Sequence, residues 1–178
     1  MILVGDIGNT DIKISLYSNN KKLILKKRIN PILLNLNKLN LHFSFLKKYL
    51  KSIDKILFCS VVPNKFIKIR KYFEKITNKK CYELKKLKID KLIKIEVKKN
   101  QVGSDRLANA IAVLEPNKNF IIIDFGTATT FDIVINKNYI GGVIAPGVQL
   151  SLENLTNKAS LIPKINLKKI KNVIGKNT

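Results

Sequence analysis

The stretch Asp6-Ile7-Gly8-Asn9-Thr10 recurs in the second half of the chain as Asp124-Phe125-Gly126-Thr127-Ala128-Thr129. In both copies an apolar run ends in an aspartate, and a glycine with small polar residues then precedes another partly apolar run. This is the pattern of a buried strand, a tight turn and a second strand. Because an internal repeat indicates a duplicated unit, we expect two lobes, residues 1–117 and 118–178, with the two loops facing each other across a cleft.

The segments around the two loops predict an α/β protein. Each copy opens a meander of strands rather than a strand-helix-strand unit. Apolar residues at helical spacing predict an amphipathic helix over 41–52, and Ser104 is a candidate cap for a helix from Asp105 to Leu114. The second copy ends after one meander and one helix-compatible stretch, so we expect the second lobe to be incomplete. The predicted strands are 2–6, 12–16, 23–25, 56–58, 81–84, 120–124, 131–135 and 139–144, and the other predicted helices are 63–75 and 148–158.

The charge balance is strongly basic, with 34 lysines and arginines against 12 acidic residues and a formal net charge of +22. Such a charge is typical of proteins that bind nucleic acid. Only Arg28, Arg70 and Arg106 are arginines, however, and tryptophan is absent, whereas nucleic-acid readers use arginine and stacking aromatics. Lysine, isoleucine and asparagine share A/T-rich codons, so genome composition explains the bias, and we do not expect nucleic acid as a main partner.

The composition also argues against several other classes of protein. No apolar run approaches the about 20 residues that span a bilayer, and the first residues lack the basic start of a signal peptide. We therefore predict a cytoplasmic protein with no membrane partner. Cys59 and Cys81 have no metal-ligand spacing and are expected to be reduced thiols in or near the core. With His42 as the single histidine, a zinc site is not expected.

The two aspartate-glycine loops have the chemistry of a phosphate and metal site. Glycine lets the backbone approach an anion closely, and the N–H groups of a turn form an anion-binding concavity. An aspartate carboxylate can hold Mg²⁺ against nucleotide phosphates, usually through water. One such loop taken alone is more simply an ordinary hairpin turn. Two loops in matching contexts favour a clamp for a triphosphate.

The segment Gly103-Ser104-Asp105-Arg106 is a second candidate for chemistry. It places Asp105 and Arg106 in the first turn of a predicted helix. A carboxylate there can accept a proton from a substrate hydroxyl as a general base, and an adjacent arginine can bind a carboxylate or phosphate. The alternative is a helix cap with a surface ion pair. That Arg106 is one of three arginines in a lysine-rich chain favours the functional interpretation.

These motifs together resemble type III pantothenate kinase, a family of the acetate kinase/Hsp70/actin superfamily. Their order and spacing agree over essentially the whole chain, and the ordered set is far more specific than any one motif. The resemblance implies a two-lobed ribonuclease H-like or actin-like ATPase fold. The matching stretches are 6–10 (DIGNT), 60–63 (SVVP), 103–109 (GSDRLAN), 123–130 (IDFGTATT), 141–147 (GGVIAPG), 161–163 (LIP) and 175–178 (GKNT).

The resemblance implies ATP-dependent phosphorylation of pantothenate to 4′-phosphopantothenate, the first step of coenzyme A synthesis. Asp105 would be the base, and Gly103, Ser104, Arg106 and Thr178 would bind pantothenate beside it. Asp124 would bind the monovalent cation, K⁺ or NH₄⁺, that the family requires, and Asp6 would hold Mg²⁺ through water. The family also implies a homodimer. The residues implied in ATP binding are Asp6, Ile7, Gly8, Asn9, Thr10, Asp11, Ile12, Lys13 and Thr127.

The chain departs from the family pattern at its end, because members of the family continue well beyond the Gly-Lys-Asn-Thr motif. Two alternatives to the kinase interpretation therefore stay open. One is a non-catalytic family member that acts as a nucleic-acid-associated accessory factor. The other is an inactive, truncated remnant.

Overall fold

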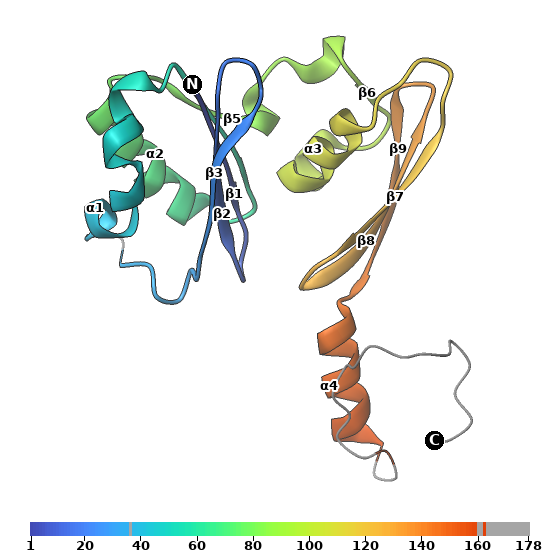
Figure 1. Cartoon of the computed structure of the whole chain (residues 1–178). Coiled ribbons are helices and arrows are strands. Elements are labelled where there is room, and N and C mark those ends of the chain that lie inside the picture. The colour runs from blue at the N-terminus through green and yellow to red at the C-terminus, as the bar shows by residue number, and fades with distance from the viewer. Residues whose placement is uncertain (36, 160–161, 163–178) are drawn as a thin grey trace.

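The computed structural model describes residues 1–35, 37–159 and 162, and it shows two β-sheets with helices beside and between them (Figure 1). The first sheet has the strand order β3-β2-β1-β4-β5, and the second has the order β6-β9-β8-β7. The strands of the first sheet are β1 (Ile2–Ile7), β2 (Ile12–Tyr17), β3 (Leu23–Ile29), β4 (Lys55–Ser60) and β5 (Cys81–Glu83). Those of the second are β6 (Lys94–Ile95), β7 (Phe120–Phe125), β8 (Ala128–Ile135) and β9 (Asn138–Pro146).

The predicted repeat is confirmed at the level of topology. β1, β2 and β3 form an antiparallel meander, and so do β7, β8 and β9. β4 and β5 then extend the first sheet in parallel on the other side of β1, and β6 pairs in parallel with β9 in the second. Both aspartate-glycine loops therefore connect the first two strands of a meander.

The first sheet is covered on one face by α1 (Leu39–His42), a 3-10 helix over Ser44–Ser52, and α2 (Pro63–Thr77) (Figure 1). α2 begins with a proline at its first position, where the missing N–H has no helical partner to lose. Asn78, in the left-handed conformation, caps its C-terminus. Apolar side chains from β1, β2 and β4 pack against Phe43, Phe66 and Phe73 beneath these helices.

The amphipathic helix predicted over 41–52 is present in large part, as a 3-10 helix over Ser44–Ser52 rather than as an α-helix. α1 ends at His42, and the chain continues in 3-10 turns, in which the amide of Leu46 donates to the carbonyl of Phe43. In a 3-10 helix, side chains three residues apart lie above one another. Phe43 and Leu46 are both buried against the first sheet, so the tighter helix aligns two core residues that have this spacing.

α3 (Ser104–Ala112) lies between the two sheets (Figure 1). It contacts β4 on one side and β8 on the other. Its buried residues Leu107 and Ala110 join Val134 and Tyr139 of the second sheet in a second apolar core. α3 is therefore the element that links the two halves of the molecule.

Both cysteines are free thiols, as the sequence predicts. Cys81 lies in the first core, and Cys59 is partly buried beside α3. Burial raises the pKa of the Cys59 thiol to about 11 and that of the Cys81 thiol to about 12. Both groups are therefore protonated and weakly nucleophilic at neutral pH.

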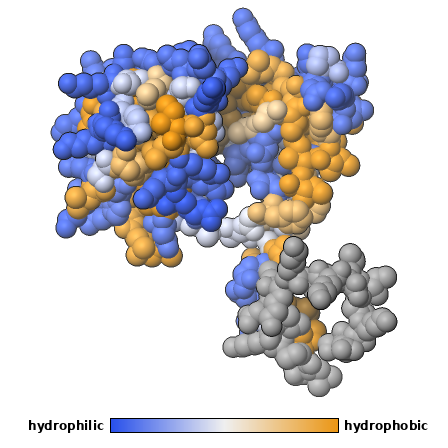
Figure 2. All heavy atoms as spheres, viewed as in Figure 1, coloured by the Kyte–Doolittle hydropathy of each residue, from blue (hydrophilic) through white to orange (hydrophobic). Residues whose placement is uncertain are grey.

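The outer face of the second sheet is apolar and exposed (Figure 2). Alternate residues of β7 and β8 share this face, among them Ile121, Ile123 and Phe131. Ile121 is 72% exposed. α4 (Val148–Lys158) extends away from the sheet and buries none of its own side chains (Figure 1). No helix in the described part of the chain is both long and apolar enough to cross a membrane.

Candidate active site

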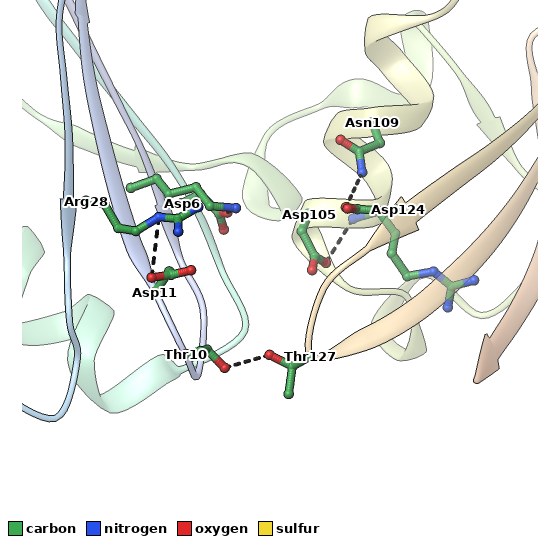
Figure 3. Close-up of polar contacts among 10 residues, drawn as sticks. Asp6, Thr10, Asp11, Arg28, Asp105, Asn109, Asp124 and Thr127 are labelled. Carbon is green, nitrogen blue, oxygen red and sulfur yellow. Dashed lines mark hydrogen bonds and ion pairs between the residues drawn. The ribbon is translucent and has the colours of Figure 1, made fainter. Parts of the chain in front are cut away.

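A cleft of about 630 Å³ lies between the two aspartate-glycine loops. The hydroxyl oxygens of Thr10 and Thr127, one from each loop, are 2.6 Å apart and share a hydrogen bond (Figure 3). Asp105 of α3 and Glu153 of α4 also line the cleft. The structure thus brings both loops and Asp105 together, whereas Gly103, Ser104 and Arg106 are not among the residues that line the cleft. From the loops, the lining residues are Asp6, Gly8, Asn9, Thr10, Asp11, Lys13, Asp124, Phe125, Gly126, Thr127 and Ala128.

A second cavity, of about 440 Å³, lies beside β4 and β5. Its lining is largely apolar and contains no residue of the predicted site. The cleft between the loops is therefore the candidate active site.

The first loop closes with a hydrogen bond of 2.9 Å from the Gly8 amide to the Asp11 carbonyl. Lys13 stands opposite Asp6 in the β1–β2 register, and its ammonium lies 3.5 Å from the Asp6 carboxylate. Ile7 and Ile12 of the predicted ATP-binding stretch are fully buried in the first core. These two residues can therefore reach a ligand only through their backbone groups.

The Asp6 carboxyl lies in an electrostatically strained environment. Burial raises its pKa, Lys13 acts in the opposite direction, and the neighbouring charges of Asp105 and Asp124 raise it further. The net effect is a pKa above the ordinary value. A bound cation would stabilise the ionised form of Asp6, which burial and the two neighbouring acids disfavour.

The second loop is held by α3 and by the start of α4. The side-chain amide of Asn109 donates a 2.9 Å hydrogen bond to Asp124 (Figure 3), and the amide of Gly147 donates to the carbonyl of Thr127 at 3.0 Å. Asn109 lies one helical turn beyond Asp105, so both side chains lie on the same side of α3. Sequence reasoning assigned no role to Asn109, although the four-residue spacing from Asp105 was a signal that could have found it.

The start of α3 differs from the prediction. Gly103 is the capping residue, and no side chain caps the helix. Ser104 instead donates a 2.5 Å hydrogen bond to Glu83 of the first sheet, so the predicted cap at Ser104 is wrong. The reason is that Ser104 is buried between α3 and β5, where the Glu83 carboxylate needs a donor. A side chain at Gly103 would collide with the Asp105 carboxylate, so glycine provides the space that Asp105 occupies.

Arg106 does not form a surface ion pair, and that alternative is wrong. Its Nε donates a 2.8 Å hydrogen bond to Oδ1 of Asp132, and its Nη2 lies 2.6 Å from the same oxygen. Its side chain is 11% exposed and that of Asp132 is fully buried. Burial lowers the pKa of Arg106, but the hydrogen bond and the charge of Asp132 outweigh it. Sequence reasoning missed Asp132, although an acid inside an otherwise apolar strand was a usable signal.

The carboxylates of the cleft fit a divalent cation whose remaining ligands come from water and a bound substrate. In the described residues, no group of three histidine, cysteine, aspartate or glutamate side chains is close enough to hold a metal ion alone. Mg²⁺ typically takes one or two carboxylates and completes its shell with water and phosphate oxygens. Asp6, at the end of β1 in the lining of the cleft, can supply such a carboxylate.

Comparison with known proteins identifies the family. The model of the family "Type III pantothenate kinase" matches residues 2–178. The chain belongs to this family. It is 58% identical to the type III pantothenate kinase of Pelagibacter ubique and 37% identical to that of a Sulfurihydrogenibium species. Both alignments cover the whole chain, which spans 72% and 73% of these relatives.

A solved structure shares the fold of this chain. A conserved Baf family transcriptional activator from Campylobacter jejuni aligns with a TM-score of 0.52 at 18% identity. The alignment covers 96% of this chain and 68% of that one. At this identity the likeness concerns the fold alone. The predicted α/β fold is confirmed, with a mixed β-sheet in each half of the chain. Thr178, the remaining predicted site residue, lies outside the described residues.

Proposed function

We propose that this chain transfers the γ-phosphoryl group of ATP to the hydroxyl of pantothenate, giving ADP and 4′-phosphopantothenate in the first step of coenzyme A synthesis. Membership of the type III pantothenate kinase family supports this reaction. The observation that carries it is that the two aspartate-glycine loops and Asp105 line one cleft. Phosphoryl transfer needs mainly positioning and charge stabilisation, which a cleft with polar walls on both sides can provide.

The two loops would bind the nucleotide. Backbone N–H groups from Asp6 to Lys13, with the hydroxyl of Thr127, would contact the phosphates, and the Lys13 ammonium would offset their charge. Lys13 is 44% exposed and only 3.5 Å from Asp6, so it can turn from that carboxylate to a phosphate. Mg²⁺, when bound near Asp6, would neutralise phosphate charge.

Asp105 would act on the second substrate. Its carboxylate borders the cleft at the start of α3, where it can accept the proton of the pantothenate hydroxyl. Gly103 and Arg106, its neighbours in the chain, would bind pantothenate beside it. Ser104 would contribute its backbone, because its hydroxyl is engaged by Glu83. Thr178 would complete the pantothenate contacts.

Four further properties belong to the same proposal. Asp124, oriented by Asn109, would hold a monovalent cation, K⁺ or NH₄⁺. The chain would form a homodimer, and the exposed apolar side chains of the second sheet are of the kind that association buries. It would work in the cytoplasm, without membrane or nucleic-acid partners. Its two lobes would be residues 1–117 and 118–178.

The test is ADP formation by the purified chain with ATP and Mg²⁺, measured with and without pantothenate. The expected result is ADP release that requires pantothenate and is faster in KCl than in NaCl. Asp105→Asn should abolish most of it. Asp90→Asn, an acid-to-amide change at a side chain that is 72% exposed and outside the cleft, is the matched control and should retain it. An ADP rate that is the same without pantothenate would contradict the proposal.

A further inference from the structure

Asp132 is a carboxylate buried inside the second sheet, and neither the predicted site nor the proposed reaction uses it. Its side chain is fully buried on β8, on the face turned toward α3. One oxygen, Oδ1, receives a hydrogen bond from Nε of Arg106 and another from the phenol of Tyr139. Tyr139, on β9, is also fully buried. Burying a charged group costs free energy unless the group is paired. The presence of this pair in the core therefore needs an explanation.

The first turn of α3 is tied to both sheets by two residues that flank Asp105. Ser104 donates to Glu83 of the first sheet, and Arg106 is bound by Asp132 of the second. Asp105 lies between these two anchors, and its Oδ1 accepts a 2.8 Å hydrogen bond from the backbone amide of Arg106. The Arg106 backbone therefore contacts the Asp105 carboxylate directly. A shift of the Arg106 backbone would move the donor that holds the Asp105 carboxylate.

Stability alone does not account for this buried charge pair. A buried ion pair often contributes no more to stability than apolar residues of the same volume, although breaking it is strongly destabilising. The contact is also imperfect for stability. Nη2 of Arg106 is at ion-pair distance from Oδ1 without hydrogen-bond geometry, and Oδ2 of Asp132 has no hydrogen-bond partner among the described residues. What the pair does provide is a fixed direction, because a guanidinium held at Nε and Nη2 cannot rotate freely.

We propose that Asp132 and Tyr139 are positioning residues for the reaction: they fix Arg106, and through it they hold Asp105 toward the cleft. This rests on the proposed function, in which Asp105 is the general base. Tyr139 orients Asp132 by donating to the oxygen that also receives Arg106. Gly142, opposite Asp132 on β9, leaves the space in which the guanidinium lies, since a side chain there would come within 2.7 Å of Nη2.

The decisive variant is Tyr139→Phe, which removes one hydroxyl and leaves the ion pair and the volume of the ring in place. Tyr82→Phe, at a tyrosine that is 41% exposed on β5, is the matched control. We expect Tyr139→Phe to lower kcat about fivefold and to leave KM for ATP unchanged, because the two loops are not touched. Asp132→Asn should lower kcat about 10²-fold, the size expected for a misplacement near 1 Å. Circular dichroism identifies any variant that fails to fold.

A second measurement does not depend on turnover. Hydrogen exchange at the Arg106 backbone amide, followed by NMR, reports whether its bond to Asp105 is kept. We expect about tenfold faster exchange in Tyr139→Phe and no change in Tyr82→Phe, with core amides such as that of Ile14 unaffected in both. The inference is overturned if the Arg106 amide exchanges in Tyr139→Phe at the rate of the unchanged chain. It is also overturned if this exchange accelerates but kcat of an active chain does not fall. If the unchanged chain shows no pantothenate-dependent turnover while Arg106 responds as expected, the proposed function fails, and the coupling of Tyr139 to Asp105 stands.

Discussion

Gly142→Ala is the substitution whose cost the structure defines most directly. Gly142 pairs with Asp132 across the β8–β9 ladder. A Cβ atom there would overlap the carbonyl oxygen of Phe131 and lie 2.9 Å from its carbonyl carbon, about 0.5 Å inside the 3.4 Å at which ordinary contact begins. It would also lie 2.7 Å from Nη2 of Arg106. Neither obstacle can move cheaply, because one is backbone within a sheet and the other is a guanidinium held by Asp132.

The expected cost follows from this overlap. Overpacking by one methyl group in a well-packed site typically costs about 1–3 kcal/mol. Since backbone atoms must separate here, we expect the upper end, about 3 kcal/mol. With a urea m-value of about 2 kcal/mol/M, the unfolding midpoint should fall by about 1.5 M. The chain has no tryptophan, so far-ultraviolet circular dichroism is the suitable probe.

The control is Gly126→Ala, in the turn between β7 and β8. A Cβ at Gly126 would approach nothing closer than 3.5 Å, which is ordinary contact. Its midpoint should therefore change much less than that of Gly142→Ala. A Gly142→Ala midpoint within about 0.2 M of the unchanged chain would show that β8 and β9 separate freely. The space around the Arg106 guanidinium would then not depend on glycine at position 142.

Three further predictions concern single groups. Asp105→Asn should lower pantothenate-dependent turnover about 10²–10⁴-fold with ATP affinity retained, as measured by coupled assay and calorimetry, and an unchanged rate would remove it from the mechanism. Because the Asp6 pKa is raised, its ionisation lowers stability as the pH rises above 3.8. Asp6→Asn should therefore raise the unfolding free energy at pH 7, but by less than about 1 kcal/mol, because water screens a side chain that is 39% exposed. In urea titrations this gain should vanish below pH 3.8. With thiol pKa values of about 11 and 12, Cys59 and Cys81 should react with a disulfide reagent at pH 8 only slowly until urea unfolds the chain, and rapid native labelling would contradict their burial.

Local features of the site were predictable from the sequence, and contacts across the fold were not. The strand-turn-strand pattern of Asp6 and Asp124 depends on neighbouring residues, so alternation and glycine sufficed to predict it. The partner of Arg106 is 26 residues away on another element, and no spacing rule connects Arg106 to Asp132. The Ser104 cap failed for the same reason, because Glu83, 21 residues earlier, competes for the hydroxyl. Local sequence predicts which hydrogen bonds a side chain can form, and tertiary contacts decide which of them it does form.

The distribution of acids explains how so basic a chain can bind a metal-nucleotide substrate. Five of its twelve acidic residues line the cleft, whereas Lys13 is the only lysine or arginine in the lining formed by the described residues. The cleft therefore has the opposite sign to the +22 of the whole chain. A polyanion without a bound cation would be repelled from this cleft. The positive charge of the lysine-rich surface therefore does not extend into the cleft. A cation reverses the balance, because it offsets the negative charge of the cleft and attracts phosphate oxygens. The acidic cleft thus favours a nucleotide that arrives with its metal ion.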